Sequence, residues 1–440
     1  MTAKQDIPRL SLFPATAKVN EQGHLSIGGC DTVELVEKFG TPLYVFDESS
    51  LRSKCAEFKK EFNQRYKGTT VVYAAKAFIN RALALLIKEE GVGLDVVSAG
   101  EMSIARSVDF PMDKVYFHGN NKSAEELSLA LQWKVGRIVV DNFQELDILA
   151  GIAKKRRNRP DILFRLTPGV DPHTHKHITT GTVDSKFGFP LSHAEEAVAQ
   201  AMSTPDLNLV GLHFHLGSQI FEVEPYLEAI RIILDFAVAM KPKYNFELRE
   251  LDIGGGFAVQ YTLDLPAPPL SVYAEAIASV ISKQCRALGL TLPRLIIEPG
   301  RAIIGPAGVA LYRVGVVKDI PGVRHYVSVD GGMADNIRPA LYGAKYEAVV
   351  ANKMLAEETE EVTIAGRFCE SGDILIRDIN LPKVTADDVL AVPQCGAYCP
   401  AMASNYNASL KPAIVLVKEG KARLIRRRET FADLTRLDSV

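Results

Sequence analysis

Short apolar runs alternate with amphipathic stretches through the first two-thirds of the 440-residue chain. The runs have the length and composition of buried strands, and the stretches between them have the period of helices packed on one face. We predict eight strands in this region. They lie near residues 71–75, 94–97, 115–117, 137–140, 162–166, 209–214, 248–253 and 294–298.

Four of the intervening stretches open with the residue pattern of a helix capping box. In this pattern a Ser or Asn is followed three residues later by a Glu, so that each can satisfy an amide of the first turn. The pairs are Ser98 with Glu101, Ser123 with Glu126, Asn142 with Glu145, and Ser192 with Glu195. Because each pair follows a predicted strand, the four together support a repeating βα unit.

Eight such units predict an α/β fold, a (β/α)₈ barrel, whose active site lies at the carboxyl ends of the strands. The alternative is a doubly wound open sheet, but no G-x-G-x-x-G or Walker A sequence follows any predicted strand. Residues able to carry chemistry do gather at predicted strand ends, as the barrel requires. They are Lys76, Asp95, His118, His213, His215, Gly254 to Gly256, and Glu298 to Arg301.

The pattern changes after about residue 307, where strands follow one another with short turns. We predict strands at 309–318, 326–330, 361–365, 389–392, 412–418 and 422–428, which is typical of an all-β domain, a β-sandwich or Greek-key barrel. The predicted domains are an N-terminal segment (1–40) that packs on the β domain, a barrel (41–306) and the β domain (307–440).

Composition excludes several classes of function. The net charge is −2, from 51 basic and 53 acidic residues, so neither nucleic acid nor an anionic membrane is an expected partner. The N-terminus lacks the apolar region of a signal peptide, and no apolar run approaches the roughly 18 residues of a membrane span. Six widely spread cysteines indicate free thiols in a reducing cytoplasm.

Lys76 ends a buried strand, and two interpretations are open. A partly desolvated lysine is a good amine nucleophile and can form a Schiff base with an aldehyde cofactor. Alternatively, the side chain extends from the strand end into water.

Two further strand ends carry similar choices. The amides of Gly254-Gly255-Gly256 can form an anion-binding nest, or the triplet is a flexible turn. Glu298 can hold a protonated ring nitrogen of a cofactor and Arg301 a substrate carboxylate, or the two form a structural ion pair.

Four other groups of residues have open interpretations. His213 and His215 share a strand face, where one ring could stack on a planar cofactor or both could bind a metal. His173, His175 and His177 indicate a flexible polar loop rather than a metal site. Cys369 is either a buried apolar thiol or a proton donor. Arg338 and Tyr342 share one face of a predicted short helix, and Tyr398 follows later; surface packing is the alternative for them.

Taken together, these motifs resemble the fold-type III pyridoxal-phosphate decarboxylases, and within them the branch that acts on diaminopimelate. The matching segments follow family order from about residue 40 to 410. They are Tyr73–Ala77, Gly211–Ser218, Gly254–Gly256, Glu298–Arg301, Arg338–Gly343, Cys369–Asp373 and Met402–Asn407.

The resemblance implies a role for each matching residue. Lys76 would hold pyridoxal 5'-phosphate covalently, His215 would stack on its ring, and Glu298 would keep its nitrogen protonated. Cys369 would be the acid that reprotonates the substrate carbon, with Lys76 as the alternative. The phosphate would be bound by Gly255, Gly256, Ser218 and Tyr398. The unreactive end of the substrate would be held by Arg301, Arg338, Tyr342, Glu370 and Tyr398.

The resemblance also implies a homodimer in which Cys369 and Glu370 reach the barrel of the second subunit. The expected reaction is decarboxylation of meso-2,6-diaminopimelate to L-lysine, because arginines suit the distal carboxylate and Glu370 suits the distal ammonium. The alternatives are a D-lysine or D-ornithine decarboxylase, a relative that binds pyridoxal phosphate without catalysis, and a metal-dependent barrel hydrolase.

Overall fold

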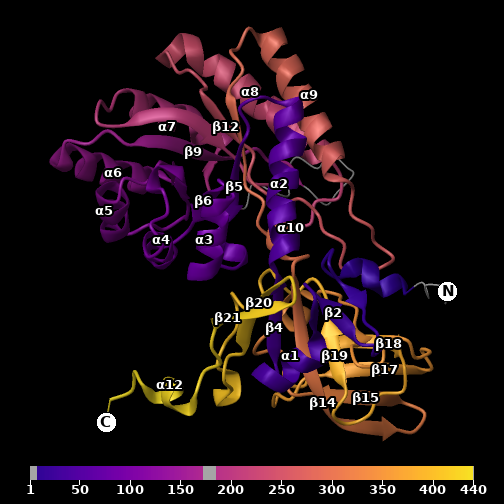
Figure 1. Ribbon diagram of the computed structural model, residues 1–440. Coiled ribbons are helices and arrows are strands. Elements are labelled where there is room, and N and C mark those ends of the chain that lie inside the picture. The colour runs from indigo at the N-terminus through magenta and orange to yellow at the C-terminus, as the bar shows by residue number, and fades with distance from the viewer. Residues whose placement is uncertain (1–6, 172–184, 440) are drawn as a thin grey trace. The chain divides into compact units, whose positions relative to one another are not determined.

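The computed structural model describes residues 7–171 and 185–439. The chain divides into two compact units. Unit 1 combines residues 1–54, 259–266 and 303–440, and unit 2 combines residues 55–258 and 267–302. Each unit has its own sheet, as Figure 1 shows.

Unit 2 is a closed barrel of eight parallel strands. Neighbours in sequence pair side by side, β8 also pairs with β9, and β13 pairs with β5 to close the ring. A short strand, β10 (Phe189–Pro190), pairs in parallel with the last residues of β9 and is not part of the ring. The barrel strands are β5 (Thr70–Ala74), β6 (Gly93–Val96), β7 (Val115–Phe117), β8 (Arg137–Val140), β9 (Asp161–Thr167), β11 (Asn208–His213), β12 (Glu250–Asp252) and β13 (Arg294–Ile297).

All eight predicted barrel strands are confirmed, and the strands near 115–117 and 137–140 match to the residue. Helices cover the outside of the ring, as Figure 1 shows. They are α2 (Glu48–Arg65), α3 (Arg81–Glu89), α4 (Ala99–Arg106), α5 (Ala124–Gln132), α6 (Phe143–Arg156), α7 (Leu191–Met202), α8 (Glu224–Tyr244), α9 (Leu270–Leu288) and the single turn α10 (Arg301–Ile304).

Three of the four predicted helix caps are confirmed. Ser98, Ser123 and Asn142 each accept a hydrogen bond from the amide three residues on, and Ser123 forms a complete capping box. The fourth prediction is wrong. Helix α7 begins at Leu191 after Pro190, so Ser192 lies inside the first turn.

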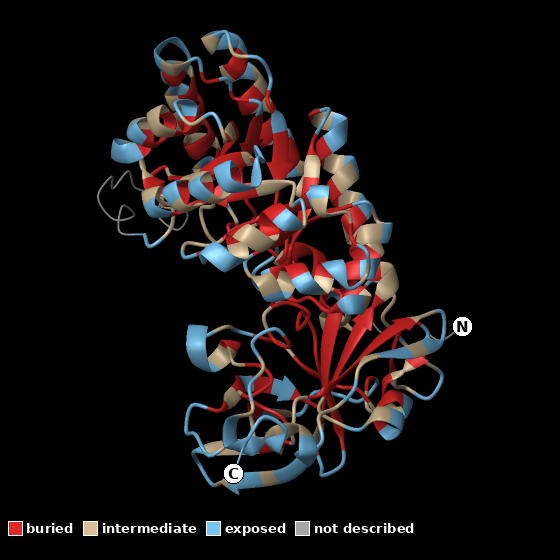
Figure 2. Cartoon of the chain, turned by 90° about the vertical axis from the view of Figure 1, so that its left-hand side faces the viewer, coloured by how far each residue is buried: buried red, intermediate tan, exposed pale blue. Residues whose placement is uncertain are grey.

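Buried apolar side chains fill the barrel. Strands of parallel sheets are covered on both faces, which explains their nearly continuous apolar runs. Figure 2 shows strands buried along their length and helices exposed on their outer faces. One cluster of buried side chains comes from six different strands: Val72, Tyr116, Val139, Leu163, Val210 and Ile296.

Unit 1 is built on a mixed nine-stranded sheet with the order β18-β17-β15-β14-β4-β20-β21. Strand β19 pairs with β14 and β16 off this path. All six strands predicted after residue 307 are present, whereas β4, β16 and β18 were not predicted. The strands are β4 (Leu43–Asp47), β14 (Gly308–Ile320), β15 (Arg324–Val329), β16 (Val349–Val350), β17 (Glu360–Ala365), β18 (Ile374–Leu381), β19 (Val389–Val392), β20 (Ala413–Lys418) and β21 (Lys421–Arg426).

The N-terminal residues of unit 1 pack on this sheet. A small sheet, β1 (Lys18–Val19), β2 (Leu25–Ile27) and β3 (Cys30–Asp31), precedes α1 (Thr32–Phe39), and the Leu25 amide donates to Ala351 O at 2.7 Å. Strand β4 pairs with β14 and β20. Short helices complete the unit: η1 (Pro8–Leu12), α11 (Arg338–Tyr342), η4 (Tyr406–Ala408) and α12 (Phe431–Thr435).

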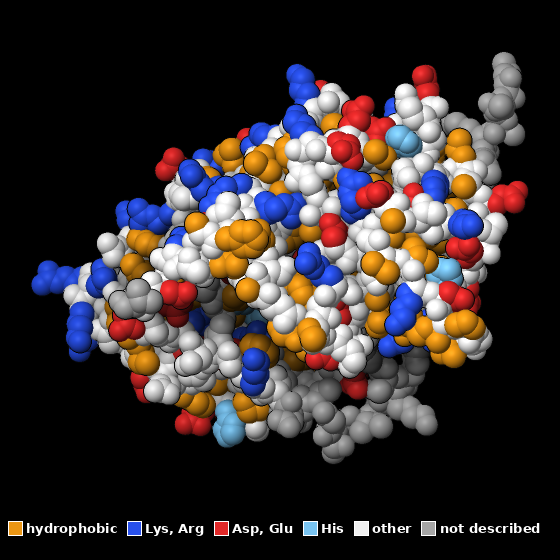
Figure 3. Space-filling model, turned by 90° about the horizontal axis from the view of Figure 1, so that it is seen from below, with side chains coloured by type: hydrophobic (Ala, Val, Ile, Leu, Met, Phe, Trp, Pro, Cys, Tyr) orange, Lys and Arg blue, Asp and Glu red, His pale blue; other side chains and the backbone are white. Residues whose placement is uncertain are grey.

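Among the described residues, no helix has the length and apolar character needed to cross a bilayer. On the face shown in Figure 3, basic and acidic side chains are interspersed over most of the surface. This mixture agrees with the small net charge of the chain.

Candidate active site

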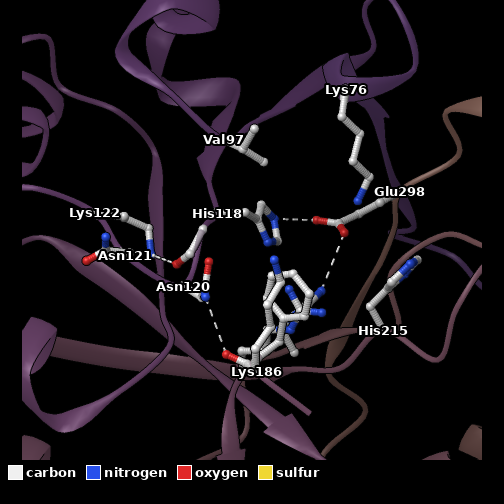
Figure 4. A pocket seen from close by; sticks show the side chains of 13 residues that line it. Lys76, Val97, His118, Asn120, Asn121, Lys122, Lys186, His215 and Glu298 are labelled. Atoms are coloured by element: carbon white, nitrogen blue, oxygen red, sulfur yellow. Dashed lines mark hydrogen bonds and ion pairs between the residues drawn. The ribbon is translucent and has the colours of Figure 1, made fainter. Parts of the chain in front are cut away.

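The carboxyl ends of the barrel strands surround a cavity of about 480 Å³. Figure 4 shows side chains from several strand ends directed into it. The side chains and loops that line it include three of the predicted site residues, Lys76, His215 and Glu298. The others are Val97, His118, Gly119, Asn120, Asn121, Lys122, Arg165, Lys186, Phe187 and His213.

Lys76 lies just after β5, in the 3₁₀ turn η2 (Ala75–Ala77). Its Nζ lies in the cavity, 3.9 Å from Oδ2 of Asp95, whose side chain is only 1% exposed. The Lys76 side chain is 40% exposed, so the amine is accessible to a ligand in the cavity. This position favours the chemical interpretation of Lys76, because its amine faces the cavity and a buried carboxylate.

Glu298 follows β13 and is held by two histidines. Its Oε1 lies 2.6 Å from Nε2 of His118, and its Oε2 lies 3.4 Å from Nε2 of His213. Burial alone would raise the pKa of Glu298, but the charge of His118 and the close ring nitrogens of His118 and His213 outweigh it and hold the pKa well below the usual value. Glu298 is therefore a buried carboxylate that stays ionised.

His215 follows β11, and its ring is hydrogen-bonded to the glycine turn. Its Nδ1 accepts a hydrogen bond from the Gly255 amide at 3.3 Å. Burial, together with the charge of Lys76, lowers the pKa of His215 well below the usual value. The ring is therefore neutral and carries its proton on Nε2, since Nδ1 is an acceptor.

The glycine turn after β12 leaves no space for side chains. A Cβ on Gly255 would lie 2.2 Å from the carbonyl oxygen of Glu298, and one on Gly256 would lie 2.7 Å from that of Gly217. The Gly254 amide donates to Oδ1 of Asp252 at 2.9 Å, and the Gly255 amide is directed to His215. Of the three amides predicted to form a nest, the first two therefore have acceptors within the protein.

Arg301 and Ser218 are brought together at the mouth of the barrel. The Arg301 side chain donates to Oγ of Ser218 from Nη2 at 2.9 Å and from Nε at 3.3 Å. This interaction replaces the predicted alternative of an ion pair between Glu298 and Arg301, because Glu298 is directed inward toward the histidines.

The remaining predicted site residues belong to unit 1. The Arg338 guanidinium is buried between the rings of Tyr261 and Tyr346, at 4.9 and 5.6 Å, and donates to the hydroxyl of Tyr346. Tyr342 is 64% exposed, and the backbone of Tyr398 is left-handed, with φ of 61°.

Cys369 and Glu370 are exposed on the unit 1 surface. The alternative of a buried apolar thiol is therefore wrong for Cys369. The Cys369 amide donates to Asn407 Oδ1 at 3.0 Å, which fixes the backbone of this loop. His173, His175 and His177 lie outside the described residues.

Four groups in the barrel could in principle bind a metal ion. His118, His213, Asp252 and Glu298 are buried, and one ligand atom of each lies within 4.8 Å of the others. Ligands of a tetrahedral zinc ion lie about 3.3 Å apart, given bonds of about 2.0–2.1 Å. The 2.6 Å contact between His118 and Glu298 is too short for that arrangement. Burial and the charge of Glu298 also raise the pKa of Asp252 well above the usual value, so Asp252 is protonated and hydrogen-bonded rather than a ligand.

Sequence comparison identifies the family. A profile described as pyridoxal-dependent decarboxylase, pyridoxal binding domain, matches residues 48–305, more than half of the chain. The chain belongs to the pyridoxal-dependent decarboxylase family. The diaminopimelate decarboxylases of Bacillus methanolicus and Bacillus subtilis (strain 168) are 48% and 46% identical to it, over 95% and 96% of this chain and 97% of each relative.

Solved structures agree with this family assignment. Diaminopimelate decarboxylase from M. jannaschii has a TM-score of 0.91 and 37% identity, covering 97% of this chain and 98% of its own. The enzyme from Helicobacter pylori, complexed with L-lysine, has a TM-score of 0.84 and 31% identity, covering 92% of this chain and 99% of its own.

The cavity residues fit pyridoxal phosphate, the cofactor of this decarboxylase family. Lys76 offers an amine, and Glu298 offers an ionised carboxylate able to hold a protonated ring nitrogen. The turn at Gly255 and Gly256 lets backbone lie where any side chain would collide, which suits close approach of a phosphate. His215 adds a neutral ring on the same lining.

Two residues that line this cavity, Arg165 and Lys122, were not assigned a role from the sequence. Arg165 lies inside β9, where its guanidinium stacks on Phe187 at 4.3 Å. Lys122 and Glu145 form a buried ion pair of 2.7 Å. A charged residue within an apolar strand and a lysine two residues after Asn120 were the available signals, but only the fold shows that they line one cavity.

The Lys122–Glu145 pair provides a stability prediction. Nζ of Lys122 donates to Gly119 O, Val139 O and Oε1 of Glu145, each at 2.7 Å. Lys122→Met leaves the Glu145 carboxylate buried without its counter-ion, so we expect the free energy of unfolding to fall by about 3–5 kcal/mol. Urea denaturation followed by circular dichroism measures this loss.

The matched control is Lys59→Met, since Lys59 and Glu90 form a more exposed pair at 3.8 Å and should contribute less than about 1 kcal/mol. A double variant, Lys122→Met with Glu145→Leu, should recover part of the loss. Equal losses for Lys122→Met and Lys59→Met would contradict the prediction.

Proposed function

We propose that this protein decarboxylates meso-2,6-diaminopimelate to L-lysine and CO₂. The observation that carries the proposal is the ionised, buried carboxylate of Glu298 in the same cavity as the Lys76 amine. Near full-length similarity to proteins named diaminopimelate decarboxylase supports the choice of substrate. The free cysteines of the described chain are consistent with work in the reducing cytoplasm.

The bound cofactor supplies an electron sink for the electron pair left when CO₂ departs. Lys76 would hold the cofactor through its amine and release it to the substrate amine. Glu298 would keep a proton on the ring nitrogen because its carboxylate stays ionised. His215 would lie against the ring, and Gly255, Gly256, Ser218 and Tyr398 would bind the phosphate. Cys369, or else Lys76, returns a proton to the substrate carbon.

We propose that five residues bind the distal end of the substrate: Arg301, Arg338, Tyr342, Tyr398 and Glu370. A guanidinium binds a carboxylate through two parallel hydrogen bonds, and a carboxylate binds an ammonium. Arg338 is held between two tyrosine rings, so little side-chain entropy remains to be lost when it binds a carboxylate.

A substrate panel with CO₂ release as the readout tests this assignment. We expect meso-diaminopimelate to be the preferred substrate of the purified protein with pyridoxal phosphate. We further expect Arg338→Ala to raise KM for this diacid by about 10–100-fold and to raise KM for D-lysine much less, because only the diacid has a distal carboxylate. Preference for D-lysine or D-ornithine would overturn the substrate assignment, and no turnover of any amino acid would favour a binding protein.

We also propose that the catalytic unit is a homodimer in which Cys369 and Glu370 complete the partner's site. Three loops of unit 1 are joined around Cys369. The Tyr406 hydroxyl donates to Cys369 O at 3.3 Å, and the Ser404 amide donates to Ala334 O at 2.8 Å. Large apolar side chains are exposed on these loops and on α11, namely Leu341, Tyr342, Met402 and Tyr406. A second copy that covered them would remove this surface from water.

Hybrid dimers test the shared site. Lys76→Ala and Cys369→Ala are each expected to be nearly inactive alone. After the two variants are unfolded, mixed equally and refolded, half of the dimers are hybrids, and each hybrid has one intact shared site. Activity should therefore recover to about a quarter of the wild-type value. Recovery of no activity, with wild-type protein refolding normally in parallel, would show that each subunit uses its own Cys369.

A further inference from the structure

His118 follows β7 and contacts Glu298 directly. The proposed function gives a role to Glu298 but none to His118. Its Nε2 lies 2.6 Å from Oε1 of Glu298 and 3.8 Å from Oδ1 of Asp95. The three side chains are 6% exposed or less. A ring nitrogen that faces two carboxylate oxygens carries a proton, since a lone pair would be repelled there. Figure 4 shows His118 directed at Glu298.

The second histidine at Glu298 cannot take the same part. His213 has its Nε2 3.4 Å from Oε2 of Glu298, and its ring packs edge-on against that of His118, with centroids 4.8 Å apart. Burial lowers the pKa of His213 to about 3, so this ring is neutral. Of the two rings against Glu298, His118 makes the closer contact, at 2.6 Å against 3.4 Å.

The position of His118 is fixed from both sides in the chain. Its amide donates to Val96 O at 2.8 Å, which ties it to the end of β6. The following loop is held by Lys122, whose buried ammonium donates to Gly119 O and Val139 O. Because these contacts involve backbone and a buried ion pair, the backbone that carries the imidazole is set in place before any ligand enters.

We propose that His118 is a positioning residue for Glu298, which orients the carboxylate and keeps it ionised so that the proton stays on the ring nitrogen of bound pyridoxal phosphate. The inference rests on the proposed role of Glu298. Asp95 faces the same ring nitrogen at 3.8 Å, and its other carboxylate oxygen lies 3.9 Å from Nζ of Lys76. The Asp95 carboxylate thus lies between the amine of the cofactor site and the histidine that contacts Glu298.

Removal of the His118 ring should raise the pKa of Glu298. Burial raises the pKa of a carboxyl group, and the charge and close contact of His118 are the largest influences that oppose burial at Glu298. Without them Glu298 competes for the proton that it would otherwise leave on the ring nitrogen. A neutral ring is a weaker electron sink, so turnover slows although the substrate binds as before.

The location of the proton can be measured directly. The ¹⁵N NMR shift of ring-labelled pyridoxal phosphate, bound to the protein without substrate, distinguishes a protonated ring nitrogen from a neutral one. We expect the protonated position in the wild type and a shift toward the neutral position in His118→Phe, which keeps ring size but loses the N–H. We expect kcat to fall about 10–100-fold and KM to change by less than about threefold.

Two further variants complete the experiment. His118→Gln retains a hydrogen-bond donor without the charge, so its shift and kcat should be intermediate; it also replaces His118→Phe if that variant does not fold. His193→Phe is the control, since His193 is exposed on α7 and does not line the cavity. A wild-type shift and kcat in both His118 variants would overturn the inference. If Glu298→Gln also leaves the shift unchanged, the role proposed for Glu298 fails instead.

Discussion

A Lys76→Ala variant should fold, bind pyridoxal phosphate weakly, and lack the visible absorbance that the bound cofactor gives the wild-type protein. Its turnover should fall by on the order of 10⁴-fold or more, because the covalent attachment and the amine that exchanges with substrate are both removed. The position of Lys76 in the cavity, 3.9 Å from buried Asp95, is the physical reason for this expectation. Absorbance spectra and CO₂ release measure the two effects.

Lys186→Ala is the matched control for this variant. Lys186 lines the same cavity and is exposed, but it does not follow β5. Its spectrum and turnover should stay close to those of the wild type. A wild-type spectrum in Lys76→Ala would exclude the attachment site, and loss of the spectrum in both variants would indicate a general effect of positive charge.

Glu298→Gln is the second large effect. The amide has the size of the carboxylate but no charge, so it cannot keep the ring nitrogen protonated. We expect kcat to fall by about 10²–10⁴-fold with a small change in KM, because Glu298 acts on the cofactor and not on the substrate. Steady-state kinetics with meso-diaminopimelate measure this split.

The control for Glu298 is another buried carboxylate of the barrel. Glu250 begins β12 and accepts hydrogen bonds of 2.7 and 2.8 Å from Arg137. Glu250→Gln therefore removes a buried charge at the amino end of a barrel strand, whereas the cavity lies at the carboxyl ends. It should lower stability and leave kcat nearly unchanged. A comparable loss of kcat in both variants would show that Glu298 matters for folding and not for chemistry.

Much of the fold could be predicted from the sequence because burial on both faces gives parallel strands a plain apolar signature. The strands ending at Ala74, Phe117 and Val140 are examples. Strand β18 was missed because exposed residues, among them Arg377 and Asp378, interrupt its apolar positions. The cap predicted at Ser192 is wrong because the local pattern cannot show that the helix already begins at Leu191, directly after Pro190.

The site was predictable where a single charged residue lies just after a buried strand, as Lys76 and Glu298 do. It was not predictable where two distant residues meet. The Gly255 amide is directed to His215, 40 residues away, and His118 meets Glu298 only because β7 and β13 belong to one closed ring. The sequence pattern predicted that His118 lies at a strand end, but only the structure shows that its partner is Glu298.

The pairing of β4 with β14 and β20 affects how the chain folds during synthesis. Strand β4 ends at Asp47, but its two neighbours begin at Gly308 and Ala413. A ribosome must therefore release almost the entire polypeptide before β4 gains both partners, whereas the barrel residues emerge as a nearly continuous stretch and can assemble earlier. Newly made chains would therefore carry an apolar β4 with both edges unpaired until the residues of β14 have been made.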